Sequence, residues 1–255
     1  MQITKLFSIL IISSFILASC SNDDDTPILS NQSANKRPLG TSSNDLLSDT
    51  IYKRLTIEMV SVQGFEPTIT AINTFKSFLE NRLFKPDGII INQRSIASSK
   101  LSPFSIEEVK QIEDINRQRF NKEGEITVYI YFADGGNEND SNTNITLGTA
   151  YLNTSIVIYQ GTLRKLASNP NAPLLSSIEG ATLIHEFAHL LGLVNIGTPL
   201  QSEHEDSNSK GHCNIQGCLM EAAIEFGSGM MDILGNGIPK LDPQCLADLK
   251  ANGGR

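Results

Sequence analysis

Two histidines and a glutamate in one short segment are the residues best suited to chemistry in this sequence. His185 and His189 are four residues apart, and Glu186 lies between them in the stretch HEFAHLLGLVN, residues 185–195. On a helix this spacing places both imidazoles on one face, where two ring nitrogens can reach one Zn²⁺. Glu186 then lies close enough to accept a proton from an attacking water without being a ligand. The H-E-x-x-H pattern therefore predicts metal-assisted hydrolysis.

A helix must position these three side chains, and the surrounding sequence predicts one. The segment 176–192 begins with Ser176 and Glu179, which have the spacing of a capping box, and ends at Gly192, a residue suited to the position after a helix. Such a helix spans roughly 22 Å. The motif is thus expected on a single helix with defined ends.

Strand and helix patterns alternate before this segment. Strands are expected from β-branched and alternating apolar residues at 52–62, 88–93 and 125–134 and within 146–161. Amphipathic helices are expected at 66–84 and 102–120, the second introduced by a capping box of Ser105 and Glu108. This order predicts an α+β fold whose N-terminal part is α/β-like, with helices packed on a twisted mixed sheet.

The first twenty residues have the pattern of an export signal. Lys5 precedes an apolar run, and the run ends in Leu-Ala-Ser-Cys20, which resembles a bacterial lipobox. An ordinary cleaved signal is the alternative. The following SNDDD resembles the acidic tag of surface-exported lipoproteins, with a solvated linker as the alternative. We therefore expect a signal peptide at 1–19, lipidation at Cys20, a flexible tether at 20–45 and one domain at 46–255, held at the outer membrane or cell surface.

Composition narrows the classes of partner. The formal net charge is −8 and no Lys/Arg cluster stands out, which argues against a nucleic-acid partner. The chain has no Trp, and aromatic residues make up 6% of it, which weakens a glycan-binding role. A protein or peptide substrate and a membrane contact through lipid are the expected partners. The sequence carries no signal for an oligomeric state.

The stretch 185–195 resembles the metzincin signature H-E-x-x-H-x-x-G-x-x-H, although Asn195 stands at the last position. The resemblance implies a zinc metalloendopeptidase with one catalytic ion, Glu186 as general base, a metzincin-like fold and a small C-terminal subdomain. In that fold an edge strand pairs with extended substrate, and 147–152 is the candidate. An asparagine amide is a poor zinc ligand, so the third ligand must lie elsewhere.

The third ligand is sought among the two remaining histidines, His204 and His212. His212 opens HCNIQGCLM, which is similar to the H-C-x-x-x-x-C-x-M segment of archaemetzincins. That similarity implies that His212 completes the site after an inserted loop and that Met220 forms the methionine turn. His204 is nearer in sequence and is the alternative ligand. A carboxylate such as Glu203 or Asp206 remains open for the metal, as do Met230 and Met231 for the turn.

The cysteines leave a second zinc in question. Archaemetzincins carry a second zinc on four cysteines, but here Asp242 stands three residues before Cys245, where a cysteine would be needed. In an oxidising compartment a disulfide between Cys213 and Cys218 is the expected use of these residues. The rival to an enzyme is a non-catalytic surface binding lipoprotein that contains zinc.

Overall fold

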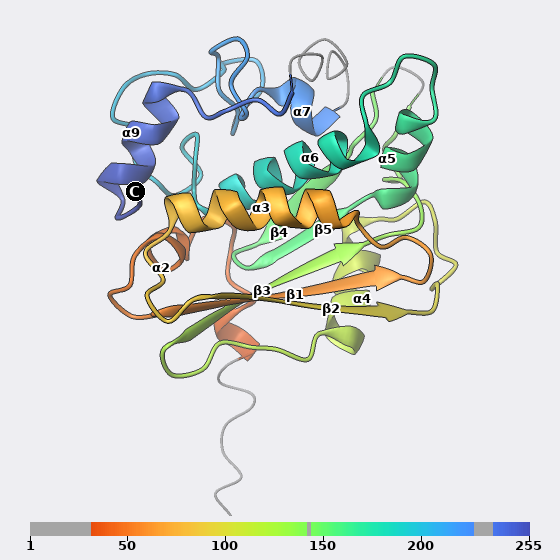
Figure 1. Ribbon diagram of the computed structural model, residues 1–255, viewed down its shortest axis with the longest axis horizontal. Helices are drawn as coiled ribbons and strands as arrows, with labels where there is room; N and C mark the ends of the chain where they lie inside the picture. Colours follow the sequence, from red (N-terminus) through yellow and green to blue (C-terminus); the bar gives the residue numbers. More distant parts are fainter. Residues whose placement is uncertain (1–31, 142–143, 227–236) are drawn as a thin grey trace, which may run out of the picture.

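A five-stranded sheet forms the centre of the computed structural model, which describes residues 32–141, 144–226 and 237–255 (Figure 1). The strand order is β2-β1-β3-β5-β4. The strands are β1 (Arg54–Val62), β2 (Ile89–Ile96), β3 (Glu125–Phe132), β4 (Gly148–Leu152) and β5 (Ser155–Ile158). Four of them are parallel, and only the edge strand β4 runs antiparallel to its neighbour β5.

Helices cover both faces of the sheet. The described helices are α2 (Ser43–Leu47), α3 (Ile69–Arg82), α4 (Ile106–Asn116), α5 (Gln160–Ala167), α6 (Leu175–Leu190), α7 (Ala222–Phe226) and α9 (Pro243–Ala251). In Figure 1, α3 and α6 lie side by side on one face and α4 lies on the other, with α7 and α9 beyond α6. The larger hydrophobic core lies on the α3 and α6 side, and a smaller one beneath α4.

The central strands are buried, as is usual for a mostly parallel sheet. Every residue of β3 and all but the first of β1 are buried, because helices cover both of their faces. The predicted mixed sheet with helices against it is confirmed, as is the capping box of Ser105 and Glu108 at the start of α4. The sequence prediction missed α5, because residues 146–161 were interpreted as strand to their end, whereas a helix begins at Gln160.

The start of α6 differs from the sequence prediction. The helix begins at Leu175 without a side-chain cap, so the expected capping box of Ser176 and Glu179 is not formed. Glu179 is fully buried and instead accepts hydrogen bonds from the backbone N–H of Thr68, at 2.9 Å, and from Gln160. These donors satisfy the buried carboxylate of Glu179 better than the backbone N–H groups at the start of its own helix would. Glu179 therefore joins α6 to the start of α3 and to α5.

The segment 20–45 was expected to be a flexible tether, and its described part is not one. Asn35 is fully buried and its amide donates to Asn121 Oδ1 at 2.8 Å, to the Thr127 carbonyl at 3.1 Å and to Thr154 Oγ1 at 3.0 Å. Polar composition concealed this packing, because the contacts of Asn35 are hydrogen bonds and not apolar burial. The folded domain thus begins upstream of residue 46.

Membrane spans were also sought within the described residues. None of the helices in 32–141, 144–226 and 237–255 is both long and apolar enough to cross a bilayer.

Candidate metal centre and active site

Helix α6 presents the H-E-x-x-H side chains from the interior of the protein. His185, Glu186 and His189 are all buried, and their helix packs against β4, β5 and α3. His185 Nδ1 lies 2.8 Å from the Leu219 carbonyl oxygen, so Nδ1 carries the proton and donates it there. This leaves the lone pair of His185 Nε2 beside His189 Nε2, which lies 3.1 Å away. The two ring nitrogens therefore lie close enough to share one cation.

The chain turns away from α6 at Gly192. This residue has a φ of 77°, in the left-handed region, and a Cβ there would lie 2.6 Å from the Thr198 backbone nitrogen. Asn195, which stands where the metzincin signature has a histidine, donates from Nδ2 to Glu205 Oε2 at 3.2 Å. Asn195 thus belongs to the loop that follows α6 and does not join the histidine pair.

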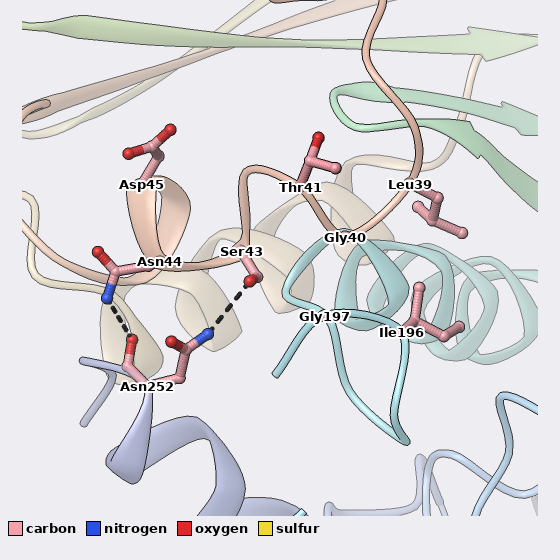
Figure 2. Close-up of a pocket in the computed structure, with 9 residues that line it drawn as sticks. All are labelled: Leu39, Gly40, Thr41, Ser43, Asn44, Asp45, Ile196, Gly197 and Asn252. Atoms are coloured by element: carbon pink, nitrogen blue, oxygen red, sulfur yellow. Dashed lines mark hydrogen bonds between the residues drawn. The ribbon is translucent and has the colours of Figure 1, made fainter. Parts of the chain in front are cut away.

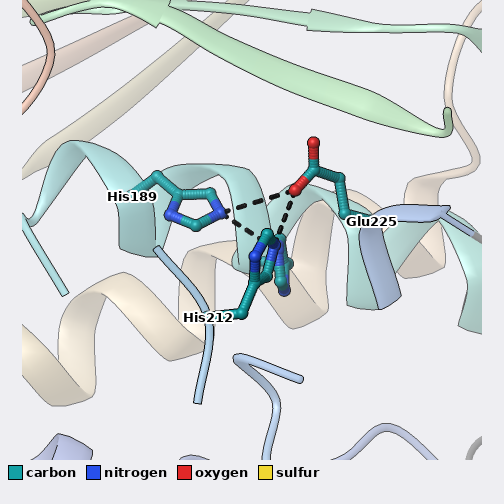
Figure 3. Close-up of side chains that lie close together, drawn as sticks. His189, His212 and Glu225 are labelled. Atoms are coloured by element: carbon teal, nitrogen blue, oxygen red, sulfur yellow. Dashed lines mark hydrogen bonds and ion pairs between the residues drawn. The ribbon is translucent and has the colours of Figure 1, made fainter. Parts of the chain in front are cut away.

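His212 returns to the pair at the end of that loop. Its ring centroid lies 5.3 Å from those of both His185 and His189. The ligand-capable atoms of these three histidines and of Glu225 all lie within 4.8 Å of one another. Figure 3 shows the Glu225 carboxylate beside the rings of His189 and His212. The structure therefore brings together the three histidines that the sequence selected and adds a fourth group.

Glu225 was missed by the sequence analysis. It lies on the short helix α7, and its Oε2 is 2.6 Å from His212 Nε2 and 4.0 Å from His189 Nε2. Neither the H-E-x-x-H pattern nor the H-C-x-x-x-x-C-x-M segment extends to Glu225, so only the fold of the loop reveals it. Glu225 thus places a carboxylate beside His189 and His212.

Glu186 is positioned as a buried base next to the sheet edge. Its Oε2 accepts a hydrogen bond from the Ala150 N–H of β4 at 2.9 Å, whereas Oε1 has no partner. Burial raises the pKa of Glu186 well above its usual value, the charge of Glu225 adds to this effect, and the Ala150 bond opposes it. Gly148 permits the close approach of β4, because a Cβ there would lie 2.6 Å from Glu186 Cγ. Glu186 thus has one anchored oxygen and one oxygen available for chemistry.

The two imidazoles of α6 are held neutral, which is the form that binds metals. Burial lowers the pKa of His185 to about 4 despite the opposing charge of Glu225. Burial also lowers the pKa of His189 well below its usual value, with the neighbouring His185 and His212 as further causes. At neutral pH both residues of α6 therefore offer free lone pairs.

A cavity of about 250 Å³ opens onto these groups. It is lined by Leu39, Thr149, Ala150, Glu186, His189, Ile196, Ser209, Lys210, Gly211, His212, Glu225 and Phe226. The wall at Thr149 and Ala150 is the edge strand β4, as expected for the segment 147–152. The cavity thus joins a sheet edge, a base and the histidine cluster.

Buried atoms without partners indicate that this site holds a ligand. His212 Nε2 and Glu186 Oε1 are buried without hydrogen-bond partners. Such atoms are rare in folded proteins and need an explanation, and a cation beside the imidazole with a water beside the carboxylate supplies one. The donor set of three imidazoles fits zinc.

Comparison with solved structures identifies the fold. The crystal structure of archaemetzincin from Methanopyrus kandleri superposes with a TM-score of 0.51 at 14% sequence identity, over 78% of this chain and 96% of that one. The chain has an archaemetzincin-like fold. A zinc-dependent peptidase from Methanocorpusculum labreanum superposes with a TM-score of 0.46 at 14% identity, over 76% of this chain and 99% of that one. No family model and no curated protein matches the sequence.

Within this archaemetzincin-like fold, His204 belongs to a second group of potential ligands. His204, Cys213, Asp242 and Cys245 offer ligand atoms within 4.8 Å of one another, and all four residues are buried. His204 Nε2 lies 2.7 Å from Asp248 Oδ2, which leaves Nδ1 directed at Cys213 Sγ, 3.4 Å away. His204 is therefore neither a solvated loop residue nor a neighbour of the H-E-x-x-H pair.

The expected disulfide between Cys213 and Cys218 is not formed. Both cysteines are free, as is Cys245, and all three are buried. Cys218 Sγ lies instead 3.8 Å from Cys245 Sγ, and Cys213 Sγ lies 3.2 Å from Asp242 Oδ2. Spacing in the sequence suggested the local pair, but the fold brings Cys245 from α9 to the same place. The cysteines thus form a cluster together with His204.

Met220 lies in the turn between the two groups. Its side chain is fully buried, and its carbonyl accepts a hydrogen bond from the Cys213 N–H at 2.7 Å. Its role as the methionine turn stays a prediction. Two other sequence predictions, lipidation at Cys20 and the alternative turn residues Met230 and Met231, lie outside the described residues.

A second cavity, of about 330 Å³, lies between the N-terminal segment and the loop after α6 (Figure 2). Asn252 joins its walls: its amide donates to Ser43 Oγ at 3.1 Å, and its carbonyl accepts from Asn44 Nδ2 at 2.8 Å. Leu39 and Ile196 line both this cavity and the one at the histidines. The N-terminal segment thus supplies part of the wall of the cavity at the histidines.

Proposed function

We propose that the protein is a zinc-dependent endopeptidase that holds its catalytic ion on His185, His189 and His212. The observation that carries this proposal is the buried carboxylate of Glu186, with one oxygen free, beside three converging imidazoles and a sheet edge. Its archaemetzincin-like fold is consistent with a protein of this kind. The combination of a base, metal ligands and a cavity that opens onto them fits hydrolysis better than storage of a metal ion.

The residues of the site have separate tasks in this mechanism. When bound, zinc supplies Lewis acidity that polarises the scissile carbonyl and acidifies the attacking water. Glu186 Oε1 accepts the proton of that water and delivers it to the leaving amine, while Oε2 stays anchored on the Ala150 N–H. Strand β4 pairs with an extended peptide along the cavity wall. The raised pKa of Glu186 suits both the acceptance and the return of the proton.

Cleavage of an unbiased peptide mixture tests this function. The zinc-loaded protein is compared with its Glu186→Gln variant and with the protein after chelation. Cleavage that is lost in both, while the variant keeps its zinc, supports the proposal. A wild-type protein that binds zinc and cleaves no peptide would favour the rival, a non-catalytic zinc-containing surface binding protein.

A second zinc is part of the proposal and would have a structural role. His204, Cys213 and Cys245 are common to any arrangement of ligands in the second group, and Asp242 and Cys218 compete for the fourth position. The Asp248 carboxylate orients His204 from behind, as is usual for imidazoles that bind metals. Thiolate-rich zinc sites in which the protein fills all four positions are structural. Metal analysis would then give two zinc ions per chain, one in each group of ligands.

We also propose that the protein is an exported lipoprotein at the cell surface or outer membrane. The support is the sequence pattern that ends at Cys20. Replacing Cys20 with Ala is expected to release the protein from membranes. Membrane association that persists in this variant would contradict lipidation at this residue.

A further inference from the structure

We propose that Glu225 is a fourth protein ligand of the catalytic zinc and closes the metal site in the resting protein. The inference rests on the proposed function, since it concerns the ion that the three histidines would hold. A zinc ion with four protein ligands has no position for an attacking water. Substrate must therefore displace the Glu225 carboxylate before hydrolysis begins.

The geometry of the four ligand atoms fits one ion. Zinc ligands at about 2.0–2.1 Å in a tetrahedron lie roughly 3.3 Å from one another. Glu225 Oε2 lies 2.6 Å from His212 Nε2 and 4.0 Å from His189 Nε2, and His189 Nε2 lies 3.1 Å from His185 Nε2. These separations lie on both sides of the tetrahedral value, so small rotations of the side chains bring all four atoms to it.

The contact between His212 and Glu225 also points to a cation. His212 Nδ1 lies 3.1 Å from Ser209 Oγ, which can accept the ring proton. When Nδ1 carries that proton, Nε2 and Glu225 Oε2 are both acceptors, and no hydrogen bond joins them. In that tautomer the two acceptors, 2.6 Å apart, repel each other unless a cation lies beside them both. Zinc would satisfy both atoms.

The anchoring of Glu225 explains how substrate would open the site. Its backbone carbonyl accepts a hydrogen bond from the Leu147 N–H at 2.8 Å, immediately before β4, and its neighbour Ile224 is fully buried. The backbone is thus fixed beside the strand that would bind peptide, while the side chain is 15% exposed to the cavity. A peptide carbonyl that enters along β4 meets this carboxylate at the metal.

The test compares cobalt-substituted and zinc-loaded forms of the full chain. Acetohydroxamate, a small metal-binding probe, is titrated into the cobalt protein by visible absorption, and zinc release to EDTA is timed. In Glu225→Gln we expect the probe to bind at least tenfold more tightly and zinc to leave at least tenfold faster. Glu225→Asp, whose carboxylate is one methylene shorter, is expected to behave in the same way. Glu107→Gln removes the same charge at a 76% exposed position on α4 and is expected to match the wild type.

The outcomes separate this inference from the proposed function. Equal probe affinity and equal zinc release in the wild type and both Glu225 variants overturn the role of Glu225. If Glu225→Gln does not fold, Glu225→Asp decides the question. The proposed function fails instead if the wild type binds no zinc or if Glu186→Gln cleaves peptides as the wild type does.

Discussion

The two groups of potential ligands differ in composition, partners and access. The imidazole group consists of three histidines and one carboxylate, namely His185, His189, His212 and Glu225. It contains buried atoms without partners and lines a cavity. The sulfur group consists of His204, Cys213, Asp242 and Cys245. Both ring nitrogens of its histidine have partners within the protein. The first group faces a cavity from which a substrate could displace one ligand, whereas no residue of the second group lines that cavity. Within one small domain, access therefore distinguishes the two groups more clearly than burial does.

Among variants that keep both zinc ions, the largest effect on cleavage is expected from removal of the base. Glu186→Gln keeps the size of the side chain and the acceptor for the Ala150 N–H but cannot accept a proton. Peptide cleavage should fall by about 10²–10⁴-fold, with both zinc ions retained. The measurement is kcat on a cleaved peptide together with metal analysis. Undiminished cleavage would move the catalytic chemistry away from the imidazole group.

Removal of one histidine from each group should separate the two ions. His212→Ala should lose the catalytic zinc and all cleavage and keep the other ion. His204→Ala should keep the catalytic zinc and lose the second ion, and its thermal midpoint should fall because structural zinc contributes free energy to folding. Metal analysis, peptide cleavage and thermal melting of both variants check this. The reverse ranking would exchange the roles of the two histidines.

The pH dependence of zinc affinity should differ between the groups. His185 has a pKa of about 4 and His189 is also lowered, so neither carries a proton to release at pH 7. In the sulfur group, hydrogen bonds from Cys218 and Cys245 lower the pKa of Cys213 to about 5, whereas contact with the neighbouring thiols raises that of Cys245. Zinc must therefore displace a proton from Cys245, and rising pH strengthens binding there about tenfold per pH unit.

The slope of zinc affinity against pH also identifies the fourth ligand of the sulfur group. Interaction with Cys213 raises the pKa of Cys218 to about 12, so binding by Cys218 releases a second proton. The affinity then rises roughly a hundredfold per pH unit. If Asp242 binds instead, the slope stays near tenfold, since the pKa of Asp242 is about 2. Zinc titrations of the metal-free protein and of His212→Ala between pH 6 and 8 measure this slope. A slope near zero in His212→Ala would contradict binding through thiolates.

The smallest effect is expected at Gly148. A Cβ there would lie 2.6 Å from Glu186 Cγ, so Gly148→Ala must shift the base without touching a histidine. We expect kcat to fall by roughly ten- to a hundredfold, with zinc content unchanged in both groups. Loss of zinc would show that β4 supports the metal ligands and not only the base.

The sequence predicted the imidazole group better than the sulfur group, for a physical reason. His185, Glu186 and His189 follow from helix periodicity, and the resemblance of the segment after them supplied His212. The sulfur group joins α9 to the loop after α6, and no local period links Cys245 to His204. Its cysteines were therefore expected to form a local disulfide.

Glu225 and the N-terminal segment show a second limit of prediction. Glu225 approaches the histidines only because a five-residue helix is placed there by tertiary contacts. Asn35 was expected in a tether because polar residues usually mark linkers, yet its buried hydrogen bonds fix it to the sheet. Local patterns identify helices and apolar strands, but they do not reveal polar contacts between residues far apart in the sequence.

His212 and Cys213 are neighbours in the chain, yet they belong to different groups of ligands. Zinc bound at one group would fix the backbone that the other group requires, and so would reduce the conformational entropy lost when the second ion binds. Thermodynamic linkage makes this effect reciprocal. The two ions should therefore load with positive cooperativity, so that each single-histidine variant holds its remaining ion less tightly than the wild type does.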